Sequence, residues 1–362
     1  MSSCASLREK FQRIKSLQAL FNQAFEEAIR SGNLEEARAL RKQIEQEIKE
    51  LRSEMITPLE RELHLKEQYE SQLRILENTS VIETLSTGEK GITGIDNKEY
   101  PIPSYQEIRT RIRESKEHEE FLETKADQGF KKLLLVPFGM SLDTLIEKYK
   151  QVILKHKQEG KLLATKENPS DPDEQLELDT NEPVWVWDKY NQADKEGKLV
   201  YYPKQFTETN HGGKTKEQIL QNARDNKGGW NILLVEDLPN IPRQGKGKTI
   251  GDKAPRKQIE AGLTSEDYLK LLQENPQYKG EQGQTPEDRI IYAITHLHET
   301  NQVIDDYQGK GSVSYEVGAW FPVFRRVPGS CWARANRQAY LGRDVSDYRN
   351  RSFGASFVAR IN

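Results

Sequence analysis

The residues with the greatest capacity for binding chemistry lie near the C-terminus and follow no periodic pattern. Between positions 319 and 353, bulky aromatic, cationic and very small side chains are mixed without the spacing of a helix face or a strand face. A core selects residues by size and a strand by alternation, so neither rule explains this composition. Arginine and aromatic residues contribute most to binding hot spots. We therefore predict a recognition surface made of Ala319, Phe321, Val323, Phe324, Gly329, Cys331, Arg334, Ala335, Tyr340, Gly342, Arg343, Tyr348, Asn350, Arg351 and Phe353.

A rigid frame has to hold such a surface, and the flanking residues indicate a β structure. Gly309, Gly311 and Gly318 are typical of turns, and residues 312–317 form a short alternating run. Residues 230–235 (WNILLV) have the length and composition of a buried strand, and another strand is expected over 198–202. Apolar residues from position 357 onward predict a last buried strand.

Helices with capping signals precede this β region. Thr264 lies three positions before Asp267, and Thr285-Pro286 precedes Asp288 by the same spacing, as in capping boxes. A shorter helix is expected over 218–222. Helices followed by a glycine-punctuated β region make this an α+β domain.

Three other motifs carry residue types suited to phosphate or metal chemistry, but their spacing is wrong. Residues 245–249 (GKGKT) resemble a phosphate loop, yet Pro242 stands where that motif needs its first glycine. His296 and His298 are two apart on a predicted helix and cannot share a metal as an i, i+4 pair would. Residues 305 and 306, both Asp, would point to opposite faces of a strand. We expect polar or turn roles here, with no metal and no cofactor.

Composition and charge limit the classes of function. The chain has 362 residues, 31% of them charged, a net charge of −3 and a mean hydropathy of −0.84, so two or three domains with exposed helices are expected. No global positive field favours nucleic acid, although residues 310–362 hold nine basic against three acidic residues. No apolar run is long enough for a membrane span, and the N-terminus has no signal-like apolar core, so a cytoplasmic protein is expected.

The C-terminal residues resemble the variable region of diversity-generating retroelement target proteins. The residues that carry the resemblance are Gly318, Trp320, 326–328 (RVP), Trp332, 336–339 (NRQA), Leu341, Asp344, 347–349 (DYR) and 354–355 (GA). The resemblance covers about residues 185–362 and implies a C-type-lectin-like fold related to the formylglycine-generating-enzyme fold. It also implies a variable region of about 318–354, whose surface residues are rewritten by error-prone reverse transcription at adenines while the intervening residues hold the fold.

This resemblance implies a non-enzymatic protein that binds an unidentified ligand, which we expect to be a protein, through the diversified surface. Two alternatives stay open. An enzyme of the formylglycine-generating type would need a pair of cysteines, whereas Cys331 is the only cysteine of this domain and Cys4 is the only other in the chain. Nucleic-acid binding through the arginine-rich end is the other alternative, and we expect it less. The calcium motifs of sugar-binding C-type lectins are absent from the sequence.

The N-terminal region is predicted to be helical and coiled-coil-like. Apolar stripes run through residues 7–28, 37–55 and 59–76, separated by Ser31-Gly32 and by Pro58. These helices suit either an intrachain hairpin or pairing between chains, so a homo-oligomer stays open.

The predicted organisation has four parts. They are a helical bundle or coiled coil over 1–80, a further helical region over 81–165, an acidic linker over 166–183 with seven acids and three prolines, and the lectin-like domain over 184–362. Within the second part, residues 130–138 (FKKLLLVPF) predict a short buried segment, and Ser141 caps a helix. Limited proteolysis in the linker is expected to leave two stable pieces.

Overall fold

The computed structural model describes residues 2–31, isolated positions between 35 and 46, and residues 57–162, 178–223, 228–309 and 311–361. The chain divides into two compact units, Met1–Glu62 and Leu63–Asn362. In the described part of the chain, no helix combines the length and the apolar character needed to cross a membrane.

The first unit contains the long helix α1 (Ser2–Arg30) and the short helix α3 (Pro58–Glu62). Along the predicted seam of α1, Ile14 and Ala28 are buried, and the rings of Phe21 and Phe25 stack at 5.4 Å. The helix predicted over 7–28 is therefore confirmed, whereas the stripe over 37–55 falls largely outside the described residues. The stripe over 59–76 is divided between α3 and α4 (Leu65–Asn78), because His64 adopts a left-handed conformation between them.

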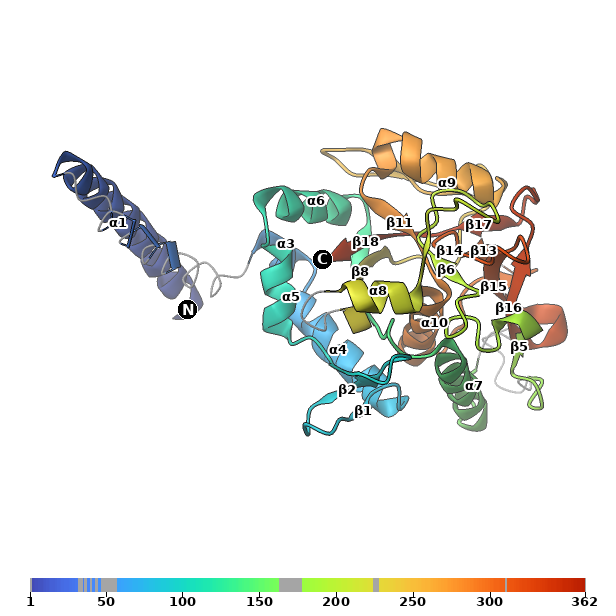
Figure 1. Ribbon diagram of the computed structural model, residues 1–362. Coiled ribbons are helices and arrows are strands. Elements are labelled where there is room, and N and C mark those ends of the chain that lie inside the picture. The colour runs from blue at the N-terminus through green and yellow to red at the C-terminus, as the bar shows by residue number, and fades with distance from the viewer. Residues whose placement is uncertain are drawn as a thin grey trace. The chain divides into compact units, whose positions relative to one another are not determined.

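An antiparallel four-stranded sheet forms one layer of the second unit, in the order β11-β18-β8-β4 (Figure 1). Its strands are β4 (Phe130–Val136), β8 (Asn231–Glu236), β11 (Glu281–Gly283) and β18 (Phe357–Ile361). The apolar runs at 130–138 and 230–235 are largely buried, as expected from their composition, and they contain the neighbouring strands β4 and β8. The predicted last strand lies beside β8.

A second sheet of six strands has the order β17-β13-β15-β16-β5, with β12 beside β15. It carries six of the predicted recognition residues, namely Gly329, Cys331, Tyr340, Gly342, Arg343 and Phe353. Its strands are β5 (Val184–Val186), β12 (Asp306–Tyr307), β13 (Val313–Tyr315), β15 (Val327–Ala333), β16 (Gln338–Asp344) and β17 (Phe353–Ala355). The central pair is an antiparallel ladder in which Cys331 faces Tyr340 and Trp332 faces Ala339. The turn η4 (Arg334–Asn336) joins the two strands.

Three small sheets complete the second unit. They contain β1 (Glu83–Thr84), β2 (Lys90–Thr93) and β3 (Glu99–Pro101); β6 (Val200–Tyr201), β7 (Lys214–Thr215) and β14 (Ala319–Trp320); and β9 (Thr249–Ile250) with β10 (Arg256–Lys257).

The helices are α5 (Tyr105–Ile112), α6 (Lys116–Asp127), α7 (Leu142–Gln158), α8 (Lys216–Asn222), α9 (Ser265–Glu274) and α10 (Pro286–Thr300), with short 3-10 turns η1 (Asp188–Tyr190) and η3 (Pro276–Tyr278). The predicted capping boxes are present at Thr264 and Thr285, and Ser141 caps α7. Helices and strands in one compact unit confirm the α+β class.

Helix α10 lies in the centre of the second unit, and it contacts α4, α7, β4 and β15. Every residue from position 286 to 297 is buried, including three consecutive charged ones. Each of the three has a polar partner: Glu287 pairs with Lys216 at 2.9 Å, Asp288 accepts from Thr285, and Arg289 pairs with Asp305. Buried charges require such partners, because desolvation without compensation costs several kcal/mol.

The predicted boundaries of the first three parts differ from the structure, in which the first compact unit ends at Glu62 and not at residue 80. Residues 81–165 do not form a separate helical region, since β4 is hydrogen-bonded to β8 and α7 contacts α10. A buried polar network also connects residues 81–165 with the predicted C-terminal domain: Lys216 donates to the Met140 carbonyl at 2.8 Å and to Asp194 at 2.7 Å. Residues 178–183 of the predicted linker run beside the six-stranded sheet, where the Asp179 amide donates to the Arg337 carbonyl. These contacts argue against two separately stable pieces, which limited proteolysis would test.

Deletion experiments test this organisation. Residues 63–362 without the first unit should unfold in one cooperative transition with a midpoint close to that of the full chain, because that unit holds both sheets. Residues 184–362 alone should not fold, because they lack β4, whose Leu133–Val136 side chains are fully buried. Urea unfolding followed by circular dichroism measures both. A cooperative transition of residues 184–362 at the midpoint of the full chain would contradict the assignment.

Candidate functional site

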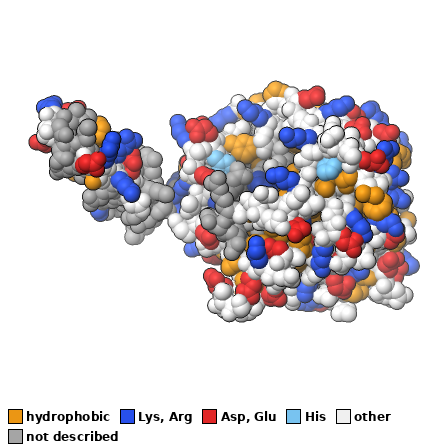
Figure 2. All heavy atoms as spheres, in the orientation of Figure 1, with side chains coloured by type: hydrophobic (Ala, Val, Ile, Leu, Met, Phe, Trp, Pro, Cys, Tyr) orange, Lys and Arg blue, Asp and Glu red, His pale blue; other side chains and the backbone are white. Residues whose placement is uncertain are grey.

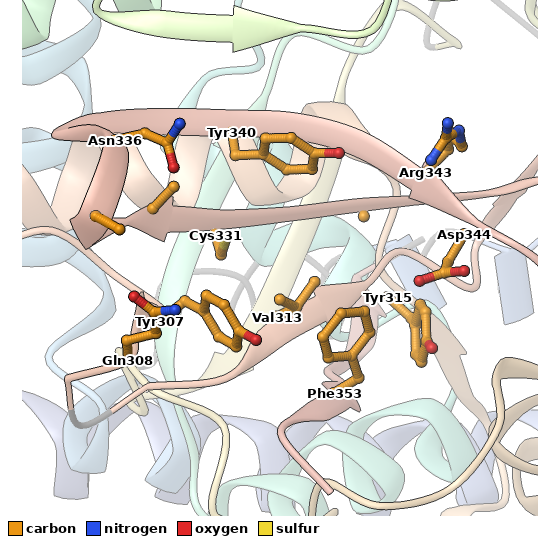
Figure 3. A pocket seen from close by; sticks show the side chains of 13 residues that line it. Tyr307, Gln308, Val313, Tyr315, Cys331, Asn336, Tyr340, Arg343, Asp344 and Phe353 are labelled. Atoms are coloured by element: carbon orange, nitrogen blue, oxygen red, sulfur yellow. The ribbon is translucent and has the colours of Figure 1, made fainter. Parts of the chain in front are cut away.

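A cavity of about 290 Å³ opens on the six-stranded sheet (Figure 3). Its lining combines small, aromatic and polar side chains from five strands and from the turns next to them. The lining residues are Tyr307, Gln308, Val313, Tyr315, Gly329, Cys331, Ala333, Ala335, Asn336, Tyr340, Arg343, Asp344 and Phe353. Six of these belong to the predicted recognition set: Gly329, Cys331, Ala335, Tyr340, Arg343 and Phe353.

Strand alternation explains which residues reach the cavity. Along β15, Gly329, Cys331 and Ala333 line it, whereas the intervening Trp332 is only 1% exposed and belongs to the core. Along β16, Tyr340 lines the cavity and its neighbour Leu341 is buried. Small residues on the outward face of β15 leave the space that the cavity occupies.

The ring of Tyr340 is held flat against the sheet. It stacks on Trp185 of β5, with ring centroids 4.5 Å apart and an angle of 4° between the planes. A Cβ atom at position 342 would meet the same ring at 2.0 Å, so Gly342 is needed for this placement. The predicted Gly342 therefore supports the cavity wall without lining it.

A cluster of aromatic rings forms the opposite side. The ring of Phe353 makes edge contacts with Tyr307, Tyr315 and Tyr348 at centroid distances of 6.2, 5.5 and 5.6 Å. The Tyr315 hydroxyl donates to the Tyr348 carbonyl at 3.0 Å, and the Asn350 amide nitrogen donates to the Tyr348 hydroxyl at 3.2 Å. The predicted Tyr348 and Asn350 thus lie beside the cavity.

Two predicted arginines have partners that orient them. The guanidinium of Arg334 donates to both carboxylate oxygens of Asp306, at 3.1 and 2.6 Å, in a bidentate ion pair. The guanidinium of Arg343 lies over the Trp187 ring, 5.4 Å from its centroid. Arg351 is exposed and is not among the residues that line the cavity.

The expectation that Ala319 and Phe321 are displayed is wrong, because both are 0% exposed. Ala319 pairs with Tyr201 in the small β14-β6-β7 sheet, and Phe321 packs in the interior against Trp187 and Tyr190. After β14, Val323 is 72% exposed. Phe324 is half-buried, with its ring edge-on to Trp187. The aromatic and arginine residues of the predicted set therefore do not all reach the surface.

Sequence reasoning missed seven lining residues: Tyr307, Gln308, Val313, Tyr315, Ala333, Asn336 and Asp344. Three of these residues could have been identified from the spacing in the sequence. Val313 and Tyr315 are two apart in the alternating run that was interpreted as frame, and Ala333 continues the two-residue spacing of Gly329 and Cys331. Tyr307 gives no such signal, since β12 reaches the site only by pairing in parallel with β15.

Burial weakens the case for thiol chemistry at Cys331. The side chain is 9% exposed, and burial raises the pKa of its thiol well above the ordinary value, with Asp305 and Glu316 acting in the same direction. The neutral thiol therefore dominates near pH 7, whereas nucleophiles and metal ligands require the thiolate.

The other sequence motifs have internal partners. The carboxylate of Glu260 accepts the backbone amides of Gly245 and Gly247 at 3.0 and 2.6 Å, so the phosphate-like loop binds a side chain of its own domain. His296 is buried, and burial lowers its pKa to about 4, while His298 is exposed. Among the described residues, no group of three or more His, Cys, Asp or Glu side chains is arranged to bind a metal ion.

Comparisons of the chain with protein-family models, with curated proteins and with solved structures found no match.

Substitutions should separate the frame of the site from its surface. Trp332→Ala should lower the free energy of unfolding by about 3–5 kcal/mol, because it removes a fully buried ring. Arg351→Ala should change it by roughly 0.5 kcal/mol or less, since the side chain is exposed. Urea unfolding of both variants provides the comparison, and similar losses in the two would contradict the division.

The buried carboxyl of Glu316 should make stability depend on pH. Burial raises its pKa to about 8, whereas the carboxyl of the unfolded chain titrates near about 4.3. Folding therefore takes up a proton between these pH values, so the free energy of unfolding falls as pH rises through the interval. Glu316→Gln should flatten this slope and stabilise the protein at pH 9 by on the order of 2 kcal/mol.

Urea unfolding at intervals from pH 5 to pH 9 measures this effect. Asp347→Asn, which changes an exposed carboxylate, is the matched control and should keep the wild-type slope. A Glu316→Gln protein whose stability still falls by the wild-type amount over this range would show that another group is responsible.

Proposed function

We propose that this protein is a diversity-generating retroelement target protein that binds a partner protein through the outward face of its six-stranded sheet. The proposal rests on the resemblance of the C-terminal residues, and the distribution of burial supports it. Of the residues that carry the resemblance, Trp320, Trp332, Leu341 and Ala355 are at most 2% exposed. Six of the residues assigned to the diversified set line one cavity. If the surface residues of a protein are diversified while its fold is kept, the diversified residues must be separate from the buried ones.

We also propose a C-type-lectin-like fold for the C-terminal region of the second unit. Two capped helices, α9 and α10, precede a β region with glycines at its turns, in the order that the resemblance implies. The first unit, with its apolar stripe along α1, would then act as a stalk, an adaptor or an oligomerising element.

Protein binding is favoured over nucleic-acid binding because three of the eight arginines in residues 310–362 are paired with acidic side chains. Arg325, Arg334 and Arg349 form ion pairs with Glu208, Asp306 and Asp267, respectively. On the face that Figure 2 displays, acidic and basic side chains are interspersed. A phosphate backbone requires clustered cations whose charge is not already compensated.

Sequencing the gene from many members of its natural population tests the diversification. Substitutions should concentrate at adenine-containing codons for the cavity residues Gly329, Cys331, Tyr340 and Arg343, and should spare Trp332. A neighbouring reverse transcriptase gene and a near-repeat of the codons for residues 318–354 are also expected. Substitutions spread evenly over buried and cavity positions would refute the proposal.

A binding selection tests the surface. Peptides enriched from a randomised display library against the protein should lose at least tenfold in affinity for a Tyr340→Ala, Arg343→Ala double variant. Lys246→Ala, which removes an exposed cation from the loop between β8 and β9, is the control and should leave the affinity unchanged. Peptides that bind the cavity variant as tightly as the wild type would place the ligand site elsewhere.

A further inference from the structure

The cavity is a slot with an apolar middle and polar ends (Figure 3). The ring of Tyr340 lies on one side and that of Tyr307 on the other, with Cys331 and Val313 between them. Asn336 lies toward one end and Asp344 toward the other. A ligand group that fills this slot needs a narrow apolar stem and a polar head.

Asp344 is the only acidic residue that lines the slot. It ends β16 and is half-buried, and its Oδ1 accepts the Val345 amide at 2.8 Å. Among the described residues, no ion pair joins its carboxylate to a cation closer than 4 Å. Burial raises the pKa of Asp344; Arg343 and Arg326 attract its charge from a distance and Asp347 repels it. The carboxylate is therefore only partly compensated, and a cation in the slot would stabilise it.

The nearest arginine is directed elsewhere. The Arg343 guanidinium lies over Trp187, 5.4 Å from the ring centroid, and in Figure 3 it lies along β16, apart from the Asp344 carboxylate. A cation–π attraction to Trp187 stabilises the Arg343 guanidinium in this position. The aromatic rings of the slot can attract a cationic ligand in the same way.

Two aromatic rings lie near the Asp344 end. Tyr315 and Phe353 lie beside it, with their centroids 5.5 Å apart and their planes at 65°. Ring faces attract cations, and a carboxylate next to them adds charge-assisted hydrogen bonds. Lysine and arginine side chains cover apolar surface with their stems while keeping the charged head at a polar site.

We propose that the slot binds an arginine or lysine side chain of the partner protein, with its stem over Cys331 and Val313 and its charged head at Asp344. This inference rests on the proposed function, because it names the ligand group that the proposed surface takes. A nucleobase between the two tyrosines is the competing occupant, but Asp344 would repel the phosphate attached to it.

Small probes test the charge requirement on the full-length protein. The probes are the Nα-acetyl amides of arginine, lysine, norleucine and phenylalanine, together with adenosine monophosphate. NMR of protein with labelled tyrosine rings reports binding, and Tyr307→Phe and Tyr340→Phe assign the resonances. Arginine and lysine amides should shift both rings and bind at least tenfold more tightly than norleucine amide, which has the lysine stem without its ammonium group.

Asp344→Asn should weaken binding of arginine amide at least tenfold while the melting temperature stays within a few degrees. Asp347→Asn is the matched control, since it removes an exposed carboxylate three residues away, and should change the affinity less than twofold. If norleucine or phenylalanine amide binds as tightly as arginine amide, the proposal of a cationic ligand is wrong, whereas the proposed ligand-binding surface still stands. Preference for the nucleotide would identify the competing occupant, and no binding by any probe would count against both proposals.

Discussion

The second unit depends on the burial of α10 together with the charges of its first turn. A helix buried on all sides cannot leave Glu287 and Arg289 without partners, because the cost of an unpaired buried charge exceeds the gain from the surrounding apolar contacts. Their partners come from distant parts of the chain: Lys216 from α8 and Asp305 from the segment before β12. The backbone carbonyl of Asp305 in turn accepts the Trp332 amide of β15, so the position of the central helix is coupled to the sheet that carries the cavity.

The cavity owes its shape to the contrast between adjacent strands. On β15 the outward positions are glycine, cysteine and alanine, whereas β16 and β17 supply tyrosine and phenylalanine. Stacking on Trp185 and the absence of a side chain at Gly342 fix the Tyr340 ring before any ligand arrives. A preorganised ring loses little conformational entropy on binding, which favours affinity from a small contact area.

Local sequence patterns were sufficient to predict several helices and strands. Capping at Thr264, Thr285 and Ser141 depends on residues within one turn, so these caps were predicted correctly. The runs at 130–138 and 230–235 are so apolar that their burial could be predicted from composition alone. The alternation in β15 and β16 also lies in the sequence, but Cys331 and Tyr340 were expected to be displayed because the mixed residue types of the segment indicated a binding surface, and Trp332 was assigned to the fold by the resemblance.

Where the compact unit begins and which residues meet at the cavity depend instead on long-range packing. The pairing of β4 with β8 joins residues about a hundred positions apart, and no local pattern specifies the partner of a strand. Phe321 has the residue type of a binding hot spot, yet it packs against Trp187 and Tyr190, which the chain brings to it from far upstream. Tyr307 and Asp344 likewise line the cavity because strand pairing and the end of a ladder put them there. Side-chain chemistry is local, whereas burial and proximity depend on long-range packing.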